Sequence, residues 1–160
     1  MGSAPIIRPA TAADVPLILQ LIRELADYEK LAHEVRATEA QLRATLFGPR
    51  PAAEVVIAEH AGQAVGFAVF FASYSTWEAA PGLYLEDLFV RQVARGRGVG
   101  RELLEYLARL TVSRGWARLE WRVLDWNEPS IAFYRKLGAE PLEDWTVFRV
   151  TGDALKKLAG

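Results

Sequence analysis

The spacing of apolar and polar residues along the chain predicts alternating strands and helices. Adjacent isoleucines at positions 6 and 7 predict a short first strand that ends at Pro9. Thr11 and Asp14 then form a capping pair ahead of apolar residues at helical spacing, so a first helix is expected to reach about Tyr28. The apolar positions of this helix are Val15, Ile18, Leu19, Ile22 and Leu25.

A second helix and three strands are predicted next. Thr38 and Gln41 form another capping box, and Gly48 followed by Pro49 stops the helix that they begin. Beyond it come apolar runs separated by short turn sequences, as in a hairpin of well-buried strands. The strands are expected over residues 54–60, 64–73 and 83–90.

The C-terminal part continues the alternation. Residues 98–114 place leucines and valine on one face of a helix that ends at Gly115, and residues 118–124 alternate charged with bulky apolar side chains, as a half-buried strand does. The remaining expectations are a short helix over residues 129–137, a strand over residues 146–150 and a terminal helix.

Composition narrows the classes of protein to consider. A chain of 160 residues fits one domain spanning residues 1–160, and a net charge of −1 supplies no cationic surface for nucleic acid. The chain has no cysteine, and its two histidines lack ligand spacing, so we expect no metal site. No apolar run approaches the ~18 residues of a membrane span, so we expect a cytoplasmic protein without a membrane partner.

The stretch over residues 83–101 carries the most chemical information. An apolar strand with two adjacent carboxylates runs into a turn rich in glycine and arginine that opens a helix. Gly96, Gly98 and Gly100 clear side chains from this turn, so that the first helix amides can point at a phosphate. The arginines at positions 95, 97 and 101 add positive charge. The alternative interpretation is a strand-to-helix connection without a ligand, in which glycine allows the turn and the arginines are solvated.

The order of elements, with this turn after the fourth strand and residues 127–134 after the fifth, resembles the GNAT superfamily of N-acetyltransferases. Five blocks are similar to its spermidine/spermine and thialysine N-acetyltransferase family: residues 8–14, 24–29, 84–87, 95–100 and 126–130. Residues 74–77, 124–127, 28–31 and 157–160 are more similar to the thialysine branch than to the polyamine branch.

This resemblance implies an α/β (α+β) fold with a mixed, mostly antiparallel central sheet flanked by helices. Acetyl-CoA would lie in a splay between strands 4 and 5, and a homodimer is implied as well. The expected acetyl-CoA-binding residues are Leu88, Phe89, Val90, Arg95, Gly96, Arg97, Gly98, Val99, Gly100, Arg101, Asn127 and Ser130.

The reaction that the resemblance implies needs two proton transfers. An alkylammonium with a pKa near 10.4 must lose a proton before its nitrogen attacks a thioester, and Glu86 would accept that proton, through water. Its neighbour Asp87 points to the opposite face wherever the strand is regular, which favours Glu86. Tyr134 would protonate the departing thiolate. The alternatives are an ion pair for the two carboxylates and a packed core aromatic for Tyr134.

The resemblance also implies an acceptor site of carboxylates and aromatic rings, which suit an ammonium on a methylene chain. Ser75 stands where the polyamine branch typically has an acid, which disfavours spermine. Glu143 and Asp144 are equally well explained as a solvated turn. The expected acceptor-site residues are Tyr28, Glu29, Ser75, Trp77, Glu86, Asp87, Glu143, Asp144 and Trp145.

Three functions follow as hypotheses. The first is acetyl-CoA-dependent acetylation of a small diamine or amino acid, with thialysine-like amines preferred over spermidine and spermine. The second is acetylation of a protein lysine, a protein N-terminus or an antibiotic by an enzyme of the same fold. The third is an acetyl-CoA-binding module without catalysis, which the carboxylate at position 86 and the phenol at position 134 disfavour.

Overall fold

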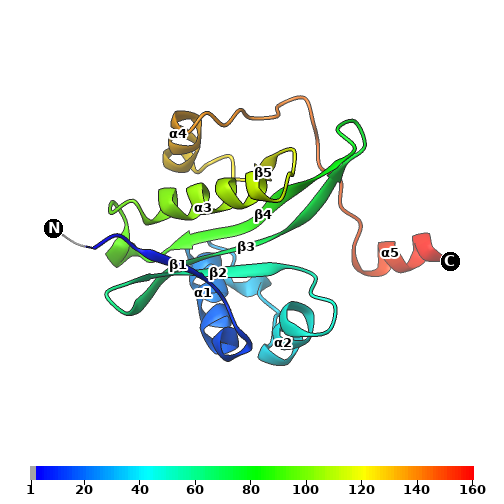
Figure 1. Ribbon diagram of the computed structural model, residues 1–160. Helices are drawn as coiled ribbons and strands as arrows, with labels where there is room; N and C mark the ends of the chain where they lie inside the picture. The colour runs from blue at the N-terminus through cyan, green and yellow to red at the C-terminus, as the bar shows by residue number, and fades with distance from the viewer. Residues whose placement is uncertain (1–2) are drawn as a thin grey trace. The chain divides into compact units, whose positions relative to one another are not determined.

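The computed structural model describes residues 3–160, which group into two compact units, one reaching to Arg122 and the other covering residues 123–160. The first unit holds the sheet and three α-helices (Figure 1). Its elements are β1 (Ile6–Pro9), η1 (Ala12–Asp14), α1 (Val15–Tyr28), η2 (Ala32–Glu34), α2 (Glu39–Phe47), β2 (Glu54–His60), β3 (Gln63–Ser75), β4 (Ala80–Val90), η3 (Gln92–Ala94), α3 (Val99–Ser113) and β5 (Leu119–Trp121).

The second unit contains α4 (Glu128–Lys136) and α5 (Gly152–Ala159). Both helices were expected, whereas the strand predicted over residues 146–150 is absent from the structure. Alternation of side chains favours an extended segment, but a strand also needs a partner for its main chain, which alternation does not supply. No helix within residues 3–160 is both long and apolar enough to cross a bilayer.

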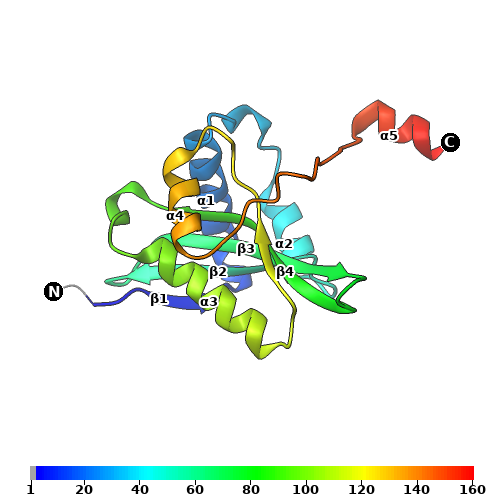
Figure 2. The same cartoon turned by 90° about the horizontal axis from the view of Figure 1, so that it is seen from above.

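The five strands form one mixed sheet in the order β1-β2-β3-β4-β5. Neighbouring strands are antiparallel from β1 to β4, and β5 is parallel to β4. Figure 2 shows the long β3 and β4 crossing the middle of this sheet. The expectation of a mixed, mostly antiparallel sheet flanked by helices is therefore confirmed.

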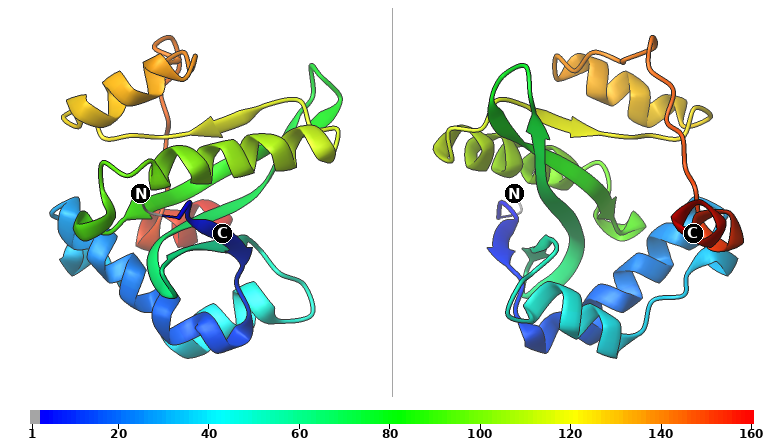
Figure 3. Two further views of the ribbon diagram at one scale, coloured as in Figure 1. Left: turned by 60° about the vertical axis from the view of Figure 1, so that its left-hand side comes forward. Right: turned by 90° about the vertical axis from the view of Figure 1, so that its right-hand side faces the viewer.

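The helices of the first unit cover both faces of its sheet. α1 and α2 lie against one face, and α3 lies along the other, on β3 and β4 (Figure 3). On the α1 face, side chains at helical spacing pack against alternate residues of three strands, as amphipathic elements require. This core consists of Ile18, Leu21, Leu25, Val55, Ile57, Phe67, Val69 and Phe89.

Both capping boxes that the sequence predicts are formed. In α2, the backbone N–H of Gln41 donates to Thr38 Oγ1 at 3.2 Å, and the backbone N–H of Thr38 donates to Gln41 Oε1 at 3.0 Å. The helix ends at Gly48, where a Cβ would lie 2.3 Å from the carbonyl oxygen of Ala44. Helix ends are predictable here because the groups that make them are neighbours in sequence.

An ion-pair cluster around Arg8 joins β1, β2 and the start of α1. The Arg8 guanidinium donates to both oxygens of Asp14, at 2.8 and 2.9 Å, and its Nε donates to Glu59 Oε1 at 2.7 Å. Asp14 Oδ2 also accepts from the backbone N–H of Thr11 at 2.8 Å. The Arg8 hydrogen bonds hold the pKa of Asp14 down at about 2.

We expect Asp14→Asn to destabilise the fold at neutral pH by about 1–2 kcal/mol. The folded-state pKa of Asp14 is depressed, so its contribution is present above the unfolded value near 4 and is lost as the pH falls toward 2. Urea unfolding should show a deficit at pH 7 that disappears near pH 2. Asp27→Asn, on the exposed side of α1, is the control; an equal, pH-independent deficit in both variants would contradict the assignment.

Candidate active site

A β-bulge interrupts β4 at the two adjacent carboxylates. Leu85 pairs with Phe70 and Asp87 pairs with Val69, which are consecutive residues of β3. Glu86 is therefore an extra residue of β4 without a partner in β3. The strand is therefore not regular at this point, so the condition under which Glu86 and Asp87 were expected to face opposite sides is not met. A bulge re-aims side chains and is common beside active sites.

Immediately beyond the bulge, β4 loses its second partner. Its parallel pairing with β5 runs from Leu83 opposite Leu119 to Leu85 opposite Trp121 and ends there. Residues 86–90 pair with β3, and within residues 3–160 no strand pairs with their other edge. This open edge includes Leu88, Phe89 and Val90, which are three of the expected acetyl-CoA-binding residues. Peptide groups on such an edge need hydrogen-bonding partners.

Two neighbouring carboxylates near the bulge influence the pKa of Asp87. Burial raises the pKa of Asp87 to about 6, with smaller contributions from Glu86 and Glu29 and an opposing one from Arg122. Burial also raises the pKa of Glu29, which ends α1. Glu86 is more open to solvent, and its Oε1 lies 3.6 Å from Arg122 Nη2. The structure thus brings Glu29, Glu86 and Asp87 together, and Asp87 is the more buried of the adjacent pair.

The glycine-rich turn depends on two of its three glycines for its backbone conformation. Gly96 has a φ of 75°, and Gly98, the N-cap of α3, has a φ of 81°. Gly100 instead lies in the first turn of α3, where a Cβ would meet only Val90 Cγ2, at 3.8 Å. The backbone conformation of the turn therefore does not require glycine at position 100. A ligand close to these amides would supply a reason for it.

The three arginines of this turn differ in what they contact. Arg95 Nε donates to the carbonyl of Val90 at 2.9 Å, and Arg101 Nε donates to Glu105 Oε1 at 2.7 Å. Within residues 3–160, no ion pair or hydrogen bond engages the Arg97 side chain. Arg101 thus carries a countercharge, and the positive charge of the turn comes mainly from Arg95 and Arg97.

One ion pair that the sequence did not reveal holds the strand end in front of this turn. Arg91 makes two 2.9 Å hydrogen bonds to the carboxylate of Glu24 in α1, and its Nη1 donates to the carbonyl of Ala64 at 2.9 Å. Its backbone N–H donates to the carbonyl of Val65 at 2.8 Å. The two charged residues are 67 positions apart, so no local pattern could have paired them.

Two of the predicted acceptor-site residues lie at the opposite end of β4. Ser75 is 6% exposed, and its Oγ accepts from the backbone N–H of Glu78 at 3.2 Å, which closes the turn between β3 and β4. Trp77 lies in that turn and is 91% exposed. The six-residue step from Ala80 to Glu86 spans roughly 20 Å at strand geometry. Within one chain, the turn and the carboxylates are therefore well separated.

The remaining predicted residues belong to the second unit. Asn127 is the N-cap of α4, and its side chain accepts from the backbone N–H of Ser130 at 3.4 Å. Tyr134 lies in α4, with its ring centroid 5.7 Å from that of Phe133. Residues 143 and 144 form a turn, with Trp145 after it. The capping bond gives Asn127 a structural role; the functional roles expected of these residues stay predictions.

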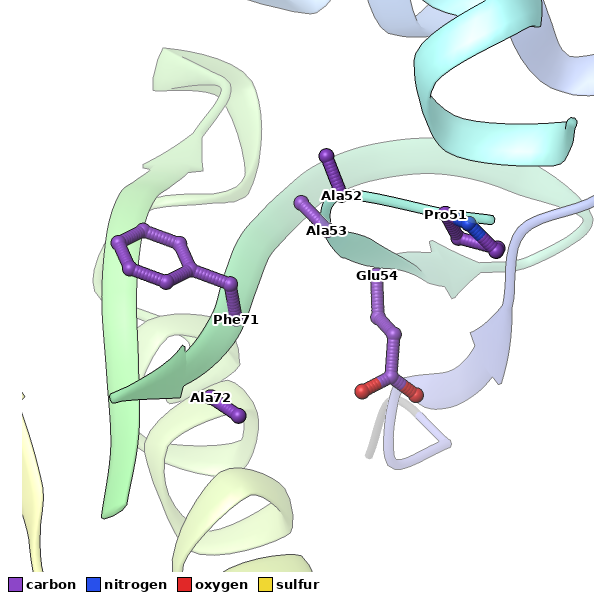
Figure 4. Close-up of a pocket in the computed structure, with 6 residues that line it drawn as sticks. All are labelled: Pro51, Ala52, Ala53, Glu54, Phe71 and Ala72. Atoms are coloured by element: carbon purple, nitrogen blue, oxygen red, sulfur yellow. The ribbon is translucent and has the colours of Figure 1, made fainter. Parts of the chain in front are cut away.

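Two pockets of the first unit do not coincide with these residues. One pocket, of about 250 Å³, lies where β2 begins, beside Phe71 and Ala72 of β3 (Figure 4). Another, of about 300 Å³, is lined by α2, α3 and the same end of β2. Neither includes a predicted site residue, and an open strand edge is not an enclosed cavity. Among residues 3–160, no group of three or more His, Cys, Asp or Glu side chains could hold a metal ion.

The sequence matches known proteins over almost all of its length. The family described as Acetyltransferase (GNAT) family matches residues 18–139. A thialysine N-epsilon-acetyltransferase from Bos taurus is 40% identical over 165 aligned residues, which cover 96% of this chain and 96% of the relative. An L-ornithine N5-acetyltransferase from Arabidopsis thaliana is 32% identical, with 95% of this chain and 86% of the relative covered.

Solved structures match the fold. An integron cassette protein from the mobile metagenome of V. cholerae aligns with a TM-score of 0.82 and 25% identity, over 99% of each chain. An aminoglycoside acetyltransferase from an uncultured soil metagenomic sample aligns with a TM-score of 0.78 over 93% of this chain and 97% of its own. At 19% identity, the latter supports the fold alone.

The buried carboxyl at the bulge leads to a prediction about stability. The folded-state pKa of Asp87 lies above its unfolded value. The contribution of its protonated carboxyl to the free energy of unfolding is therefore fully present below about pH 4 and is lost as the pH rises through 6. We therefore expect Asp87→Asn to be more stable than the wild type above pH 6, by about 1–3 kcal/mol, and equally stable below pH 4. Denaturant unfolding at several pH values measures this difference.

Glu86→Gln is the matched control for Asp87→Asn, since it changes the adjacent and more exposed carboxyl. Because the Glu86 charge contributes to the raised pKa of Asp87, Glu86→Gln should keep the wild-type loss of stability above pH 4 and make it shallower, whereas Asp87→Asn removes it. If the difference in stability between Asp87→Asn and the wild type were constant from pH 4 to pH 8, folding would not raise the pKa of Asp87, and the assignment would be contradicted.

Proposed function

The chain belongs to the Acetyltransferase (GNAT) family, and we propose that it transfers an acetyl group from acetyl-CoA to a primary amine of a small diamine or amino acid. The observation that carries this proposal is the open edge of β4, which lies between a cluster of carboxylates and a glycine turn at a helix N-terminus. An acyl donor with phosphates at one end and an amide-containing arm matches this arrangement: the phosphates would lie at the glycine turn, and the arm would lie along the strand edge toward the carboxylates.

The residues of the first unit fit acetyl-CoA in two ways. Along residues 88–90, the peptide groups that face away from β3 would hydrogen-bond the amides of the pantetheine arm of acetyl-CoA, except for the Val90 carbonyl, which accepts from Arg95 Nε at 2.9 Å. The amides at the start of α3 point out of a turn in which Gly98 holds a positive φ and Gly100 leaves room for a close phosphate. Asn127 and Ser130 would add contacts from α4, while Arg97 contributes unpaired positive charge.

The carboxylates would manage the proton of the amine. At pH 7 an alkylammonium is deprotonated in only about one molecule in two to three thousand, so a nearby proton acceptor speeds attack on the thioester carbon. Glu86 accepts this proton, through water, in our proposal. Asp87, with a pKa of about 6, is the second acceptor in the same cluster, and Glu29 attracts the ammonium electrostatically.

Tyr134 completes the proposed chemistry at the leaving group. As the bond between the acetyl carbon and sulfur breaks, the coenzyme A thiolate takes up a proton, for which a phenol is a suitable donor. Starting from the ammonium, the nitrogen gains the acetyl group and loses two protons. One proton goes to Glu86, and the other replaces the proton that Tyr134 gives to the thiolate, so charge and atoms balance. Direct attack in a ternary complex needs no covalent enzyme intermediate.

The full-length relatives favour a small amino acid or diamine as the acceptor. The Bos taurus and Arabidopsis thaliana relatives act, by their names, on thialysine and L-ornithine, which both carry a primary amine on a short chain. We therefore propose that a thialysine-like amine is preferred over spermidine and spermine.

An amine panel tests this function directly. Purified protein, acetyl-CoA and one amine at a time are assayed for thiol release, and the acetylated product is identified by mass spectrometry. The panel contains thialysine, L-ornithine, lysine, spermidine, spermine, a lysine peptide and an aminoglycoside. Highest kcat/KM for a small amino acid supports the proposal. Preference for the peptide or the aminoglycoside contradicts it, as does acetyl-CoA binding without turnover.

Gly100 offers a test of the phosphate turn in which stability and affinity change in opposite directions. Gly100→Ala should stabilise α3 by up to about 1 kcal/mol, because alanine is the better helix former and its Cβ has space. The same Cβ should obstruct acetyl-CoA and weaken its affinity about tenfold or more, measured by calorimetry. Glu102→Ala, also in the first turn of α3, is the control. A stabilised variant with unchanged acetyl-CoA affinity would contradict the phosphate-turn assignment.

Tyr134→Phe tests the proposed acid. The substitution keeps the ring beside Phe133 and removes only the hydroxyl, so the melting temperature and acetyl-CoA affinity should change little. Turnover should fall about a hundredfold or more, as expected when a general acid is lost. Tyr106→Phe removes a hydroxyl from α3 as the control. Equal turnover in the two variants would exclude Tyr134 as the proton donor.

A further inference from the structure

Arg95 reaches from the glycine turn back to the end of α1. Its guanidinium carbon lies 4.7 Å from the centroid of the Tyr28 ring and 5.7 Å from that of Phe89. Its Nε donates to the carbonyl of Val90 at 2.9 Å, which sets the direction of the side chain. Arg95 is thus held by one hydrogen bond and two aromatic contacts, although it precedes Gly96 in the predicted phosphate turn.

The ring that Arg95 contacts stands next to the carboxylate cluster. Tyr28 is the last residue of α1, and Glu29, which follows it, influences the pKa of Asp87. Phe89, the second ring near the guanidinium, is 7% exposed and belongs to the core between α1 and the sheet. Phe89 is therefore fixed by the core, whereas Tyr28 is 39% exposed.

Resting on the proposed function, we infer that Arg95 is a positioning residue for Tyr28 and so influences amine binding as well as the phosphate turn. The Val90 carbonyl and the fixed Phe89 ring hold the guanidinium, and the guanidinium holds the Tyr28 ring in place beside Glu29. The two ends of the proposed ternary complex are then linked by a single side chain.

Arg97 provides a matched control for this inference. It carries the same charge in the same turn, two residues further on, but within residues 3–160 its side chain has no ion pair or hydrogen bond. If Arg95 acts only as a positive charge, Arg95→Ala and Arg97→Ala should weaken acetyl-CoA binding and leave amine binding unchanged. If Arg95 positions Tyr28, only Arg95→Ala should affect the amine.

The test compares the KM for the preferred amine, at saturating acetyl-CoA, with the calorimetric Kd for acetyl-CoA. We expect Arg95→Ala to raise the amine KM about two- to fivefold, the range of an exposed cation–π contact, while Arg97→Ala leaves it unchanged. Tyr28→Leu removes the ring, and in the Arg95→Ala background it should add less than it does alone. Tyr28→Phe keeps the ring and should preserve the Arg95 effect.

A second measurement does not depend on turnover. The Tyr28 ring signals in an aromatic 1H–13C NMR spectrum should shift in Arg95→Ala and stay in place in Arg97→Ala. If the wild type acetylates no amine, the proposed function fails, and the ring signals alone decide the positioning role. Unmoved ring signals in Arg95→Ala would overturn the inference, and so would fully additive effects of Arg95→Ala and Tyr28→Leu on the amine KM.

Discussion

The early end of the pairing between β4 and β5 is the constraint on which the rest of the candidate site depends. After Leu85 the two strands no longer hydrogen-bond, so β4 continues for five residues with one edge open. Its other edge remains paired with β3, and Phe89 is held in the core under α1. The open segment is therefore held by β3 and the core, while the peptide groups that face away from β3 stay available, apart from the Val90 carbonyl that Arg95 contacts. A flexible loop would have to be ordered at the moment of binding, at a cost in conformational entropy.

The features that the sequence predicts well are those made by residues close together in the chain. Thr38 with Gln41 defines the start of α2, and Gly98 marks the start of α3, because capping and turn conformations involve neighbouring groups. The length of β5 is different. Residues 118–124 alternate as a strand should, but the strand extends only where β4 offers a partner, and this depends on how β4 is placed by β3. The bulge at Glu86 likewise depends on how β4 pairs with β3, which the local sequence does not determine.

The contacts of the charged residues in the site also divide into those that local sequence spacing can indicate and those that it cannot. The sequence contains three arginines around the glycine turn, but only the structure shows that they differ in their contacts. Arg101 faces Glu105 one helical turn away, a pairing that i,i+4 spacing could have indicated. Arg95 turns toward Tyr28, and Arg91 meets Glu24, and both partners come from a helix formed more than sixty residues earlier. Such contacts depend on the packing of α1 against the sheet, which local spacing does not describe.

The bulge in β4 also bears on solubility. An open strand edge can recruit a strand from another molecule, and sheets that leave one exposed are prone to aggregate. Glu86 stands out of register at the start of this edge, and Asp87 follows it directly. An incoming strand would have to match an interrupted ladder and bury its own residues beside carboxylates. The irregularity that re-aims these side chains therefore also protects the edge from pairing with a second chain.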